Sequence, residues 1–221
     1  MKKITLLFTL LISIIGFAQS PIITMISDGD CSGGNPKVVE LYADGIVDFA
    51  NYSLEIQTNS STTWGNTLNL ASLGVVTDGF VYIYKDDPSF ASEYPSATNV
   101  LPTTSSAVNF NGNDRIRIIE DATTSVIDQF GEDSVDGSGE VWEYQDGYAK
   151  RVDGSGPDVG FVEGNWIYFN GALNGEGTCQ GGSTFESIIG IGTYTTAGVP
   201  SLLVVDAEPS GSTTTVAPNE L

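Results

Sequence analysis

The chain has 221 residues, of which 28 are acidic and 8 are basic, so its formal net charge is −20 at neutral pH. A surface of this charge repels phosphate backbones and anionic lipids, so we expect no nucleic-acid partner for this module. The chain contains no histidine, which excludes Ser-His-Asp catalysis, Cys-His catalysis and histidine-ligated zinc sites. An enzyme built on this sequence would have to use carboxylates, tyrosine, lysine or a metal held by oxygen ligands.

Residues 1–18 are typical of a secretory signal peptide. Lys2 and Lys3 give a positively charged start, residues 4–15 are apolar, and small residues lead to an expected cleavage site after Ala18. The apolar run is too short to cross a membrane, and no later stretch predicts a membrane anchor. We therefore expect a secreted protein, extracellular or periplasmic.

The first part of the mature chain predicts a strand over residues 21–26 and a loop over residues 27–36, which is rich in Gly, Asp and Asn. Asp28 and Asp30 in this loop have the oxygen-rich pattern of a calcium loop, but the bidentate Glu of an EF-hand is absent at the required spacing. The alternative is a loop held by Asx turns. Asp28 and Asp30 remain candidate binding residues, and Ca²⁺ is the one cofactor that the sequence brings into consideration.

Residues 38–56 predict two strands joined by a turn, and the rest of the chain repeats this arrangement. Val39 and Leu41 fall on one face of the first strand, which is the two-residue period of a half-buried strand. The Asp44-Gly45 pair predicts the turn, because such pairs favour positive φ.

The remaining elements are short strands with little helix. In the strand at residues 115–119, Ile116 and Ile118 are expected inward, and Arg115 and Arg117 outward. Strands at this spacing predict an all-β fold, an immunoglobulin-like two-sheet β-sandwich with a short helical turn and an irregular C-terminal tail. The other expected elements are strands at residues 64–70, 80–84, 125–130 and 149–151, a segment lying against the sandwich at 165–169, one helical turn at 90–94 and a loop at 101–107.

The expected domain spans residues 19–176, because the sequence beyond it becomes rich in Gly, Ser and Thr. Residues 177–221 are therefore expected to form a tail or linker. Cys31 and Cys179 are the two cysteines, and in an exported chain an even number favours a disulfide bond between them. The alternative is a pair of buried free thiols.

Four pieces of the sequence together resemble the lamin-tail domain family, in its secreted bacterial form. VELY at residues 39–42 and DFANYSL at 48–54 are similar to the family's VELYN strand and its vDLSGYSL segment, although Ala43 stands where the family usually has Asn. FNGNDRI at 110–116 and VID at 126–128 resemble later strands of that family. The resemblance covers about residues 22–151. It implies an immunoglobulin-like sandwich and a non-catalytic module, which in secreted bacterial proteins often accompanies nucleases, phosphatases or other hydrolases.

Two carboxylates stand inside otherwise apolar strands, Glu40 and Asp128. They could form the acid and base of a hydrolase, but the separation that such a pair needs cannot be derived from sequence. The alternative is that each one caps a loop or pairs with an arginine.

Trp142 and Tyr144 are the candidate residues of an aromatic surface that would stack against sugar rings. Trp64, Tyr148 and Trp166 could extend it. The alternative is packing in the core or at a sheet edge, the commoner role of aromatic residues in a sandwich.

These observations predict a secreted, non-catalytic binding or spacer module of an extracellular bacterial protein, with an unidentified extracellular ligand or partner domain. No catalytic residue and no metal site is assigned. Two alternatives stay open: an extracellular hydrolase that uses carboxylates and a metal, associated with nuclease or phosphatase chemistry, and a glycan-binding, lectin-like domain.

Overall fold

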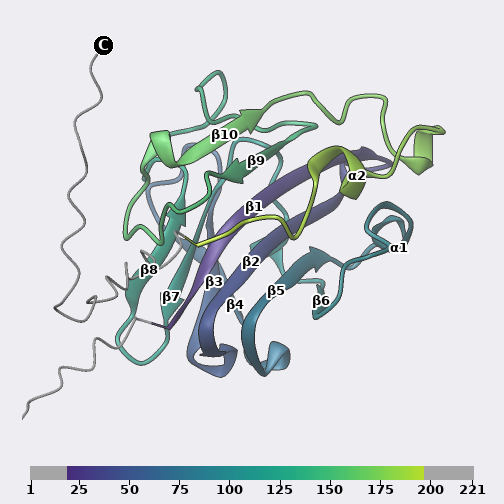
Figure 1. Cartoon of the computed structure of the whole chain (residues 1–221). Helices are drawn as coiled ribbons and strands as arrows, with labels where there is room; N and C mark the ends of the chain where they lie inside the picture. The colour runs from purple at the N-terminus through teal and green to yellow at the C-terminus, as the bar shows by residue number, and fades with distance from the viewer. Residues whose placement is uncertain (1–18, 197–221) are drawn as a thin grey trace, which may run out of the picture.

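The computed structural model describes residues 19–196 and confirms an all-β sandwich of two sheets (Figure 1). In the six-stranded sheet the order is β10-β9-β1-β2-β5-β6, and in the four-stranded sheet it is β4-β3-β7-β8. The first sheet contains β1 (Ser20–Cys31), β2 (Asn35–Asp48), β5 (Val75–Lys85), β6 (Val100–Thr103), β9 (Tyr148–Arg151) and β10 (Trp166–Phe169). The second contains β3 (Tyr52–Gln57), β4 (Gly65–Asn69), β7 (Arg115–Glu120) and β8 (Ser125–Phe130).

The helices are short. Within residues 19–196, besides α1 (Ser89–Glu93) and α2 (Phe185–Ile189), the structure has five 3-10 turns, at Phe49–Asn51, Ala71–Leu73, Ser106–Val108, Glu163–Asn165 and Thr178–Gln180. The expected helical turn is confirmed as α1, where the Asp87 carboxylate accepts a hydrogen bond from the Ser89 amide at 2.9 Å. The second helix, α2, was not predicted.

The core between the sheets follows the two-residue period of the sequence. Val39 and Leu41 are fully buried there, as are Ile116 and Ile118 of the opposite sheet. Aromatic rings fill the end of this core, where Phe130 lies edge-on to several of them. The inward positions of these aliphatic residues are therefore confirmed.

The expected loop at residues 27–36 is wrong, because β1 and β2 continue almost through it. Asp28 faces Lys37 in the antiparallel register, and only residues 32–34 form the turn. Gly33 and Gly34 in that turn have φ of 77° and 66°, a region that suits residues without a Cβ. The Asp and Gly residues that favoured a loop lie in a paired hairpin.

The turn expected at Asp44-Gly45 is a bulge inside β2. The register with β5 shifts between Ala43 and Ile46, and Gly45 has φ of 73°. An extra residue in one strand bends it without ending the pairing. The chain reverses later, at the 3-10 turn that follows Asp48.

Three further expectations need correction. Arg115 lies on the outer face as expected but is fully buried there, because its guanidinium donates to the side-chain oxygen of Gln57 and to the carbonyl oxygens of Asn59 and Ser61. The expected loop at residues 101–107 contains β6, which pairs with β5 in parallel. The segment at residues 165–169, expected only to lie against the sandwich, forms the strand β10, which pairs with the outer edge of β9.

The segment from residue 177 to 196, here called the strap, crosses the outer face of the six-stranded sheet (yellow-green in Figure 1). Phe185 and Ile189 of α2 are buried there against the outward side chains of the sheet. α2 is capped at its start by Thr184, whose hydroxyl accepts from the Ser187 amide, and at its end by Gly190 with φ of 68°. The prediction of a linker from Gly177 onward is therefore wrong for the strap.

Because the strap covers one face and the second sheet covers the other, β1 and β2 are buried on both sides. Ten of the twelve positions of β1 are consecutive buried residues, polar Thr24 and Ser27 among them. The expected signal peptide, residues 1–18, and the rest of the expected tail, residues 197–221, lie outside the described residues.

Candidate functional site

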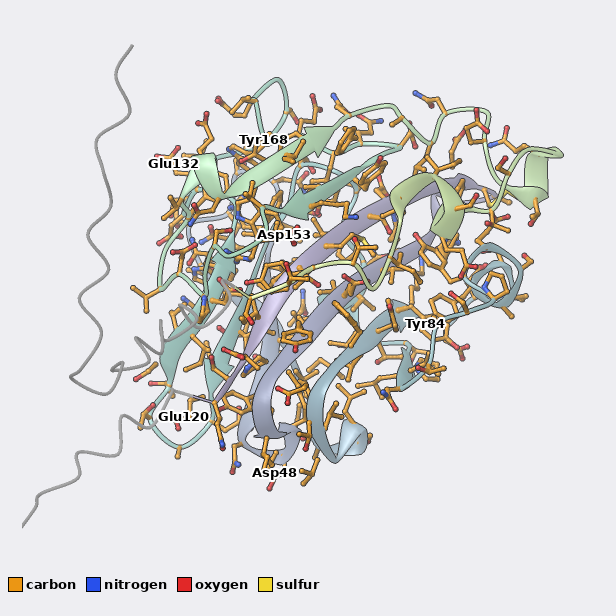
Figure 2. All side chains as sticks on the ribbon, in the orientation of Figure 1. Asp48, Tyr84, Glu120, Glu132, Asp153 and Tyr168 are labelled. Carbon is orange, nitrogen blue, oxygen red and sulfur yellow. A yellow bond between two sulfur atoms is a disulfide. The ribbon has the colours of Figure 1, made fainter. Side chains whose placement is uncertain are left out.

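A cleft of about 430 Å³ lies on the outer side of the six-stranded sheet, between β9, β10 and the strap. Its surface is more apolar than polar. The Phe169 ring stacks on Tyr148 with centroids 4.5 Å apart, and Ile167 is 50% exposed. The lining residues are Tyr148, Lys150, Arg151, Val152, Asp153, Ile167, Phe169, Ile189, Thr193 and Tyr194. Figure 2 shows Asp153 beside the strap, at the end of β9.

Lys150 lines this cleft, and its ammonium group is hydrogen-bonded to the strap. Its Nζ donates to the carbonyl oxygens of Ile189 at 3.0 Å and Gly190 at 2.7 Å, and to the Thr193 hydroxyl at 2.9 Å. An ammonium has three hydrogens, so these bonds use its whole capacity. Burial lowers the pKa of Lys150, although the nearby Glu40 carboxylate acts in the opposite direction. Lys150 therefore fastens the strap and leaves no free donor for a ligand.

Arg151 points to the other side of β9 and forms a buried ion pair with Asp128 of β8. The two carboxylate oxygens of Asp128 lie 2.6 and 2.7 Å from Arg151 Nη2, and neither side chain is exposed. Arg151 also donates from Nη1 to Asp158 at 3.0 Å and lies over the Trp166 ring at 4.4 Å from its centroid. This network joins the two sheets near β10.

The remaining acceptor capacity of Asp128 is filled by backbone amides. Ile23 donates to it at 2.7 Å and Asp158 at 2.9 Å. Burial nevertheless raises the pKa of Asp128 to about 6, against the lowering effect of Arg151. The alternative in which Asp128 pairs with an arginine is confirmed.

Glu40 lies under the strap, on the opposite side of the six-stranded sheet from the Asp128 pair. One carboxylate oxygen accepts from the Thr24 hydroxyl and the other from the Gly192 amide, each at 2.7 Å. Burial raises the pKa of Glu40, while these hydrogen bonds act to lower it. Glu40 and Asp128 therefore serve two separate structural roles and do not share one site as an acid and a base.

Asp28 and Asp30 lie on β1 and not in an open loop. Asp28 forms a buried ion pair with Lys37, and burial raises the pKa of Asp28. Asp30 is more exposed, and its Oδ2 accepts from the Gly175 amide and the Gln180 side chain, each at 2.8 Å. The open, calcium-type loop considered for Asp28 and Asp30 is therefore not present at these residues.

The expected aromatic surface is absent at Trp142 and Tyr144, which are 2% and 0% exposed. Both rings pack edge-on to Phe130 in the core. The Tyr144 hydroxyl donates to the Asp114 carbonyl at 3.2 Å, so its polar end is satisfied inside. Trp166 is also in this core, which confirms the packing alternative for these residues.

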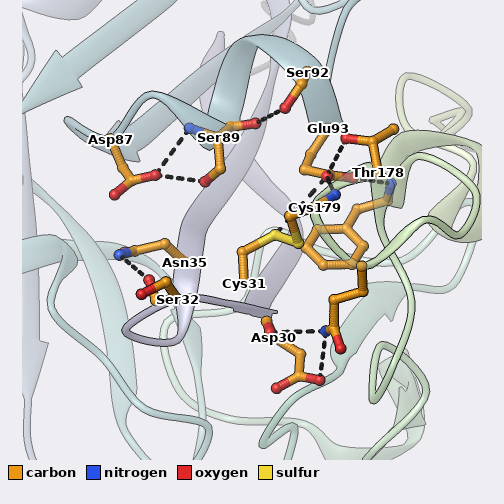
Figure 3. The surroundings of a disulfide bond; sticks show 12 residues. Asp30, Cys31, Ser32, Asn35, Asp87, Ser89, Ser92, Glu93, Thr178 and Cys179 are labelled. Atoms are coloured by element: carbon orange, nitrogen blue, oxygen red, sulfur yellow. Dashed lines mark hydrogen bonds between the residues drawn. A yellow bond between two sulfur atoms is a disulfide. The ribbon is translucent and has the colours of Figure 1, made fainter.

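The disulfide between Cys31 and Cys179 is confirmed, with Cα atoms 5.9 Å apart (Figure 3). It joins the end of β1 to the start of the strap. Cys31, Cys179 and Glu93 have ligand atoms close enough together to hold a metal ion. The two sulfurs are bonded to each other, however, so no thiolate is available there.

Glu93 strengthens the same junction and was missed by the sequence analysis. Its Oε1 accepts from the Thr178 hydroxyl at 2.5 Å and the Cys179 amide at 3.0 Å, and its Oε2 from the Phe185 amide at 3.2 Å. Figure 3 shows how Glu93 reaches from α1 toward the strap. An acidic residue in a short helix gives no local signal for this role, because its partners lie more than eighty residues later.

Comparison of the chain with protein-family models, with curated proteins and with solved structures found no match. The resemblance to the lamin-tail family therefore stays a prediction.

Proposed function

We propose that this protein is a secreted, non-catalytic module of lamin-tail type, which serves as a binding or spacer domain in an extracellular protein. The observation that carries this proposal is the state of the buried carboxylates. Asp28, Glu40, Glu93 and Asp128 are all buried, and each one accepts hydrogen bonds or an ion pair from the fold itself. A hydrolase needs a carboxylate that faces substrate or a reactive water.

Export is supported by the disulfide and by the signal-like start of the sequence. Disulfides persist in oxidising compartments outside the cytoplasm. In the described part of the chain, no helix is long and apolar enough to cross a bilayer. Expression in an exporting host, followed by N-terminal sequencing, tests the cleavage site; we expect the mature chain to begin at Gln19.

The test of the non-catalytic role is an assay of the exported protein against panels of nucleic acids, phosphate esters and glycans, with Mg²⁺ and Ca²⁺ supplied. We expect no turnover. Turnover that is lost in Glu40→Gln, but retained in Glu163→Gln, would contradict the proposal and favour the carboxylate hydrolase. Glu163 is the matched control because it is exposed and lies in a surface 3-10 turn.

Glycan-array binding separates the lectin-like alternative from the proposed module. Because Trp142 and Tyr144 are buried, we expect no glycan signal that depends on them. A signal that is lost on substitution of the partly exposed Trp64, with folding intact, would favour the glycan-binding role.

A further inference from the structure

β10 is an outer strand of the six-stranded sheet, and no other strand of the described residues pairs with its free edge. Its outer face carries Ile167 and Phe169, which are 50% and 36% exposed and line the cleft. Native proteins usually cover an apolar edge strand of this kind, because it is a template for pairing with a further strand. This edge and the adjoining cleft are therefore suited to receive an extended apolar segment.

The described chain ends at the mouth of the same cleft. The Thr195 carbonyl accepts from the Gly154 amide at 2.8 Å, and the Thr195 amide donates to the Asp153 carboxylate at 2.8 Å. Asp153 and Tyr194 both line the cleft. Thr195 is thus held beside the residues that follow β9, the strand that pairs with β10.

We propose that residues 201–206 of this chain, with the sequence SLLVVD, bind along the free edge of β10 as an added strand and place alternate apolar side chains in the cleft. Four consecutive apolar residues, LLVV, make this the most apolar stretch after residue 196. Leucine and valine fill apolar pockets, and valine favours strands. The segment is charged only at Asp206, so the acidic surface does not repel its apolar part.

The length of chain permits this placement. Four residues, 197–200, can span up to about 14 Å when extended. A strand added to the free edge of β10 would lie two strand spacings, about 10 Å, from β9, beside whose end Thr195 is held. A cleft of about 430 Å³ is within the size range of pockets that enclose small apolar groups. A tethered segment also has an effective concentration of about millimolar, which favours it over a second copy of the protein. The inference does not depend on the proposed non-catalytic role.

Hydrogen-exchange mass spectrometry on the exported, disulfide-bonded chain tests the proposal. In the wild type we expect amides of residues 201–206 to exchange at least about tenfold more slowly than an unstructured peptide. Ile167→Asp should abolish this protection, because it puts a charge in the cleft. Val159→Asp is the matched control, since Val159 is an exposed apolar residue outside the cleft, and it should leave the protection unchanged.

A second pair of variants tests the strand arrangement. Leu202→Asp with Val204→Asp, and Leu203→Asp with Val205→Asp, place charges on opposite faces of a strand. Only one of the two double variants should lose the protection completely. Protection of β1 and β2 amides serves as the check that each variant is folded.

Four results would overturn the inference. The first is exchange of residues 201–206 at the unstructured rate in the wild type. The second is protection that survives Ile167→Asp in a folded protein, and the third is equal loss in the Val159→Asp control. The fourth is protection that appears only as protein concentration rises together with a dimer mass, which would assign the edge to a second copy.

Discussion

Replacement of Arg151 by methionine tests whether the buried ion pair holds the two sheets together. Arg151 donates to both oxygens of Asp128 and, through Nε, to the Ile23 carbonyl at 2.6 Å. Methionine keeps much of the apolar stem but leaves the Asp128 carboxylate with no counter-charge in a site that is 0% exposed. Removal of one partner from a buried pair of this kind destabilises proteins by about 3–5 kcal/mol.

That loss is large beside the total stability of a domain, which is about 5–15 kcal/mol. Urea unfolding at pH 7, with the disulfide intact, measures it. Arg117→Met is the matched control, because its pair with Glu55 is partly exposed and should contribute at most about 1 kcal/mol. The double variant Arg151→Met with Asp128→Leu should recover much of the loss, because no buried charge then remains. A loss below about 1 kcal/mol in Arg151→Met would refute this reasoning.

Three further predictions concern pH, the disulfide and limited proteolysis. Burial raises the pKa of Asp128 from 3.8 to about 6, so the folded state binds this proton more tightly than the unfolded state does. The contribution of Asp128 to stability is therefore complete below about pH 4 and is lost as the pH rises through about 6. The urea concentration at the unfolding midpoint should fall over this range, and it should fall less steeply in Asp128→Asn. An equally steep fall in that variant would argue that Asp128 is not the group responsible. Reduction of the Cys31–Cys179 bond, which spans 148 residues, should lower the free energy of unfolding by about 4–5 kcal/mol in the chain-entropy treatment. Limited proteolysis of the oxidised protein should cut after Thr196 before it cuts the strap, whereas a first cut within residues 180–190 would contradict the observed packing.

The elements that could be predicted are those whose signal is local. Val39 and Leu41 are two residues apart and both lie in the core between the sheets, whereas Val38 lies on the opposite, outer face, because successive side chains of a strand point to opposite faces. The disulfide could be predicted from the even cysteine count and the expected export. Neither inference needed knowledge of which strands are neighbours.

The loop expected before β2 shows where local composition misleads. Asp28 and Gly29 favour a loop in isolation, but in the paired hairpin the charge of the Asp28 carboxylate is balanced by its ion pair with Lys37. At Gly29 a Cβ would overlap the Asn35 carbonyl, so glycine is needed for close pairing of the strands. The ion pair of Asp28 and the close approach at Gly29 form only when the two strands have paired, so the local sequence does not reveal them.

The roles of the buried polar residues could not be predicted, because their partners come from distant parts of the chain. The Ile23 amide reaches Asp128 across 105 residues, and the Gly192 amide reaches Glu40 across 152. The packing of the strap against the sheet could not be predicted for the same reason. Its Gly, Ser and Thr content is typical of a linker, but Glu93 and the disulfide fix its start, and Phe185 and Ile189 bury its helix.

The position of the disulfide also determines how the molecule would carry mechanical load. The described chain enters at the start of β1, and Cys31 at the other end of β1 is bonded to Cys179. Tension applied at residues 19 and 196 would peel the strap as far as Cys179 and then pass through the sulfur bridge. From there the force runs along β1 alone, a strand of 12 residues and about 40 Å. The chain between the two cysteines lies outside the path of the force, so most of the sandwich would stay folded while the module bears a pull.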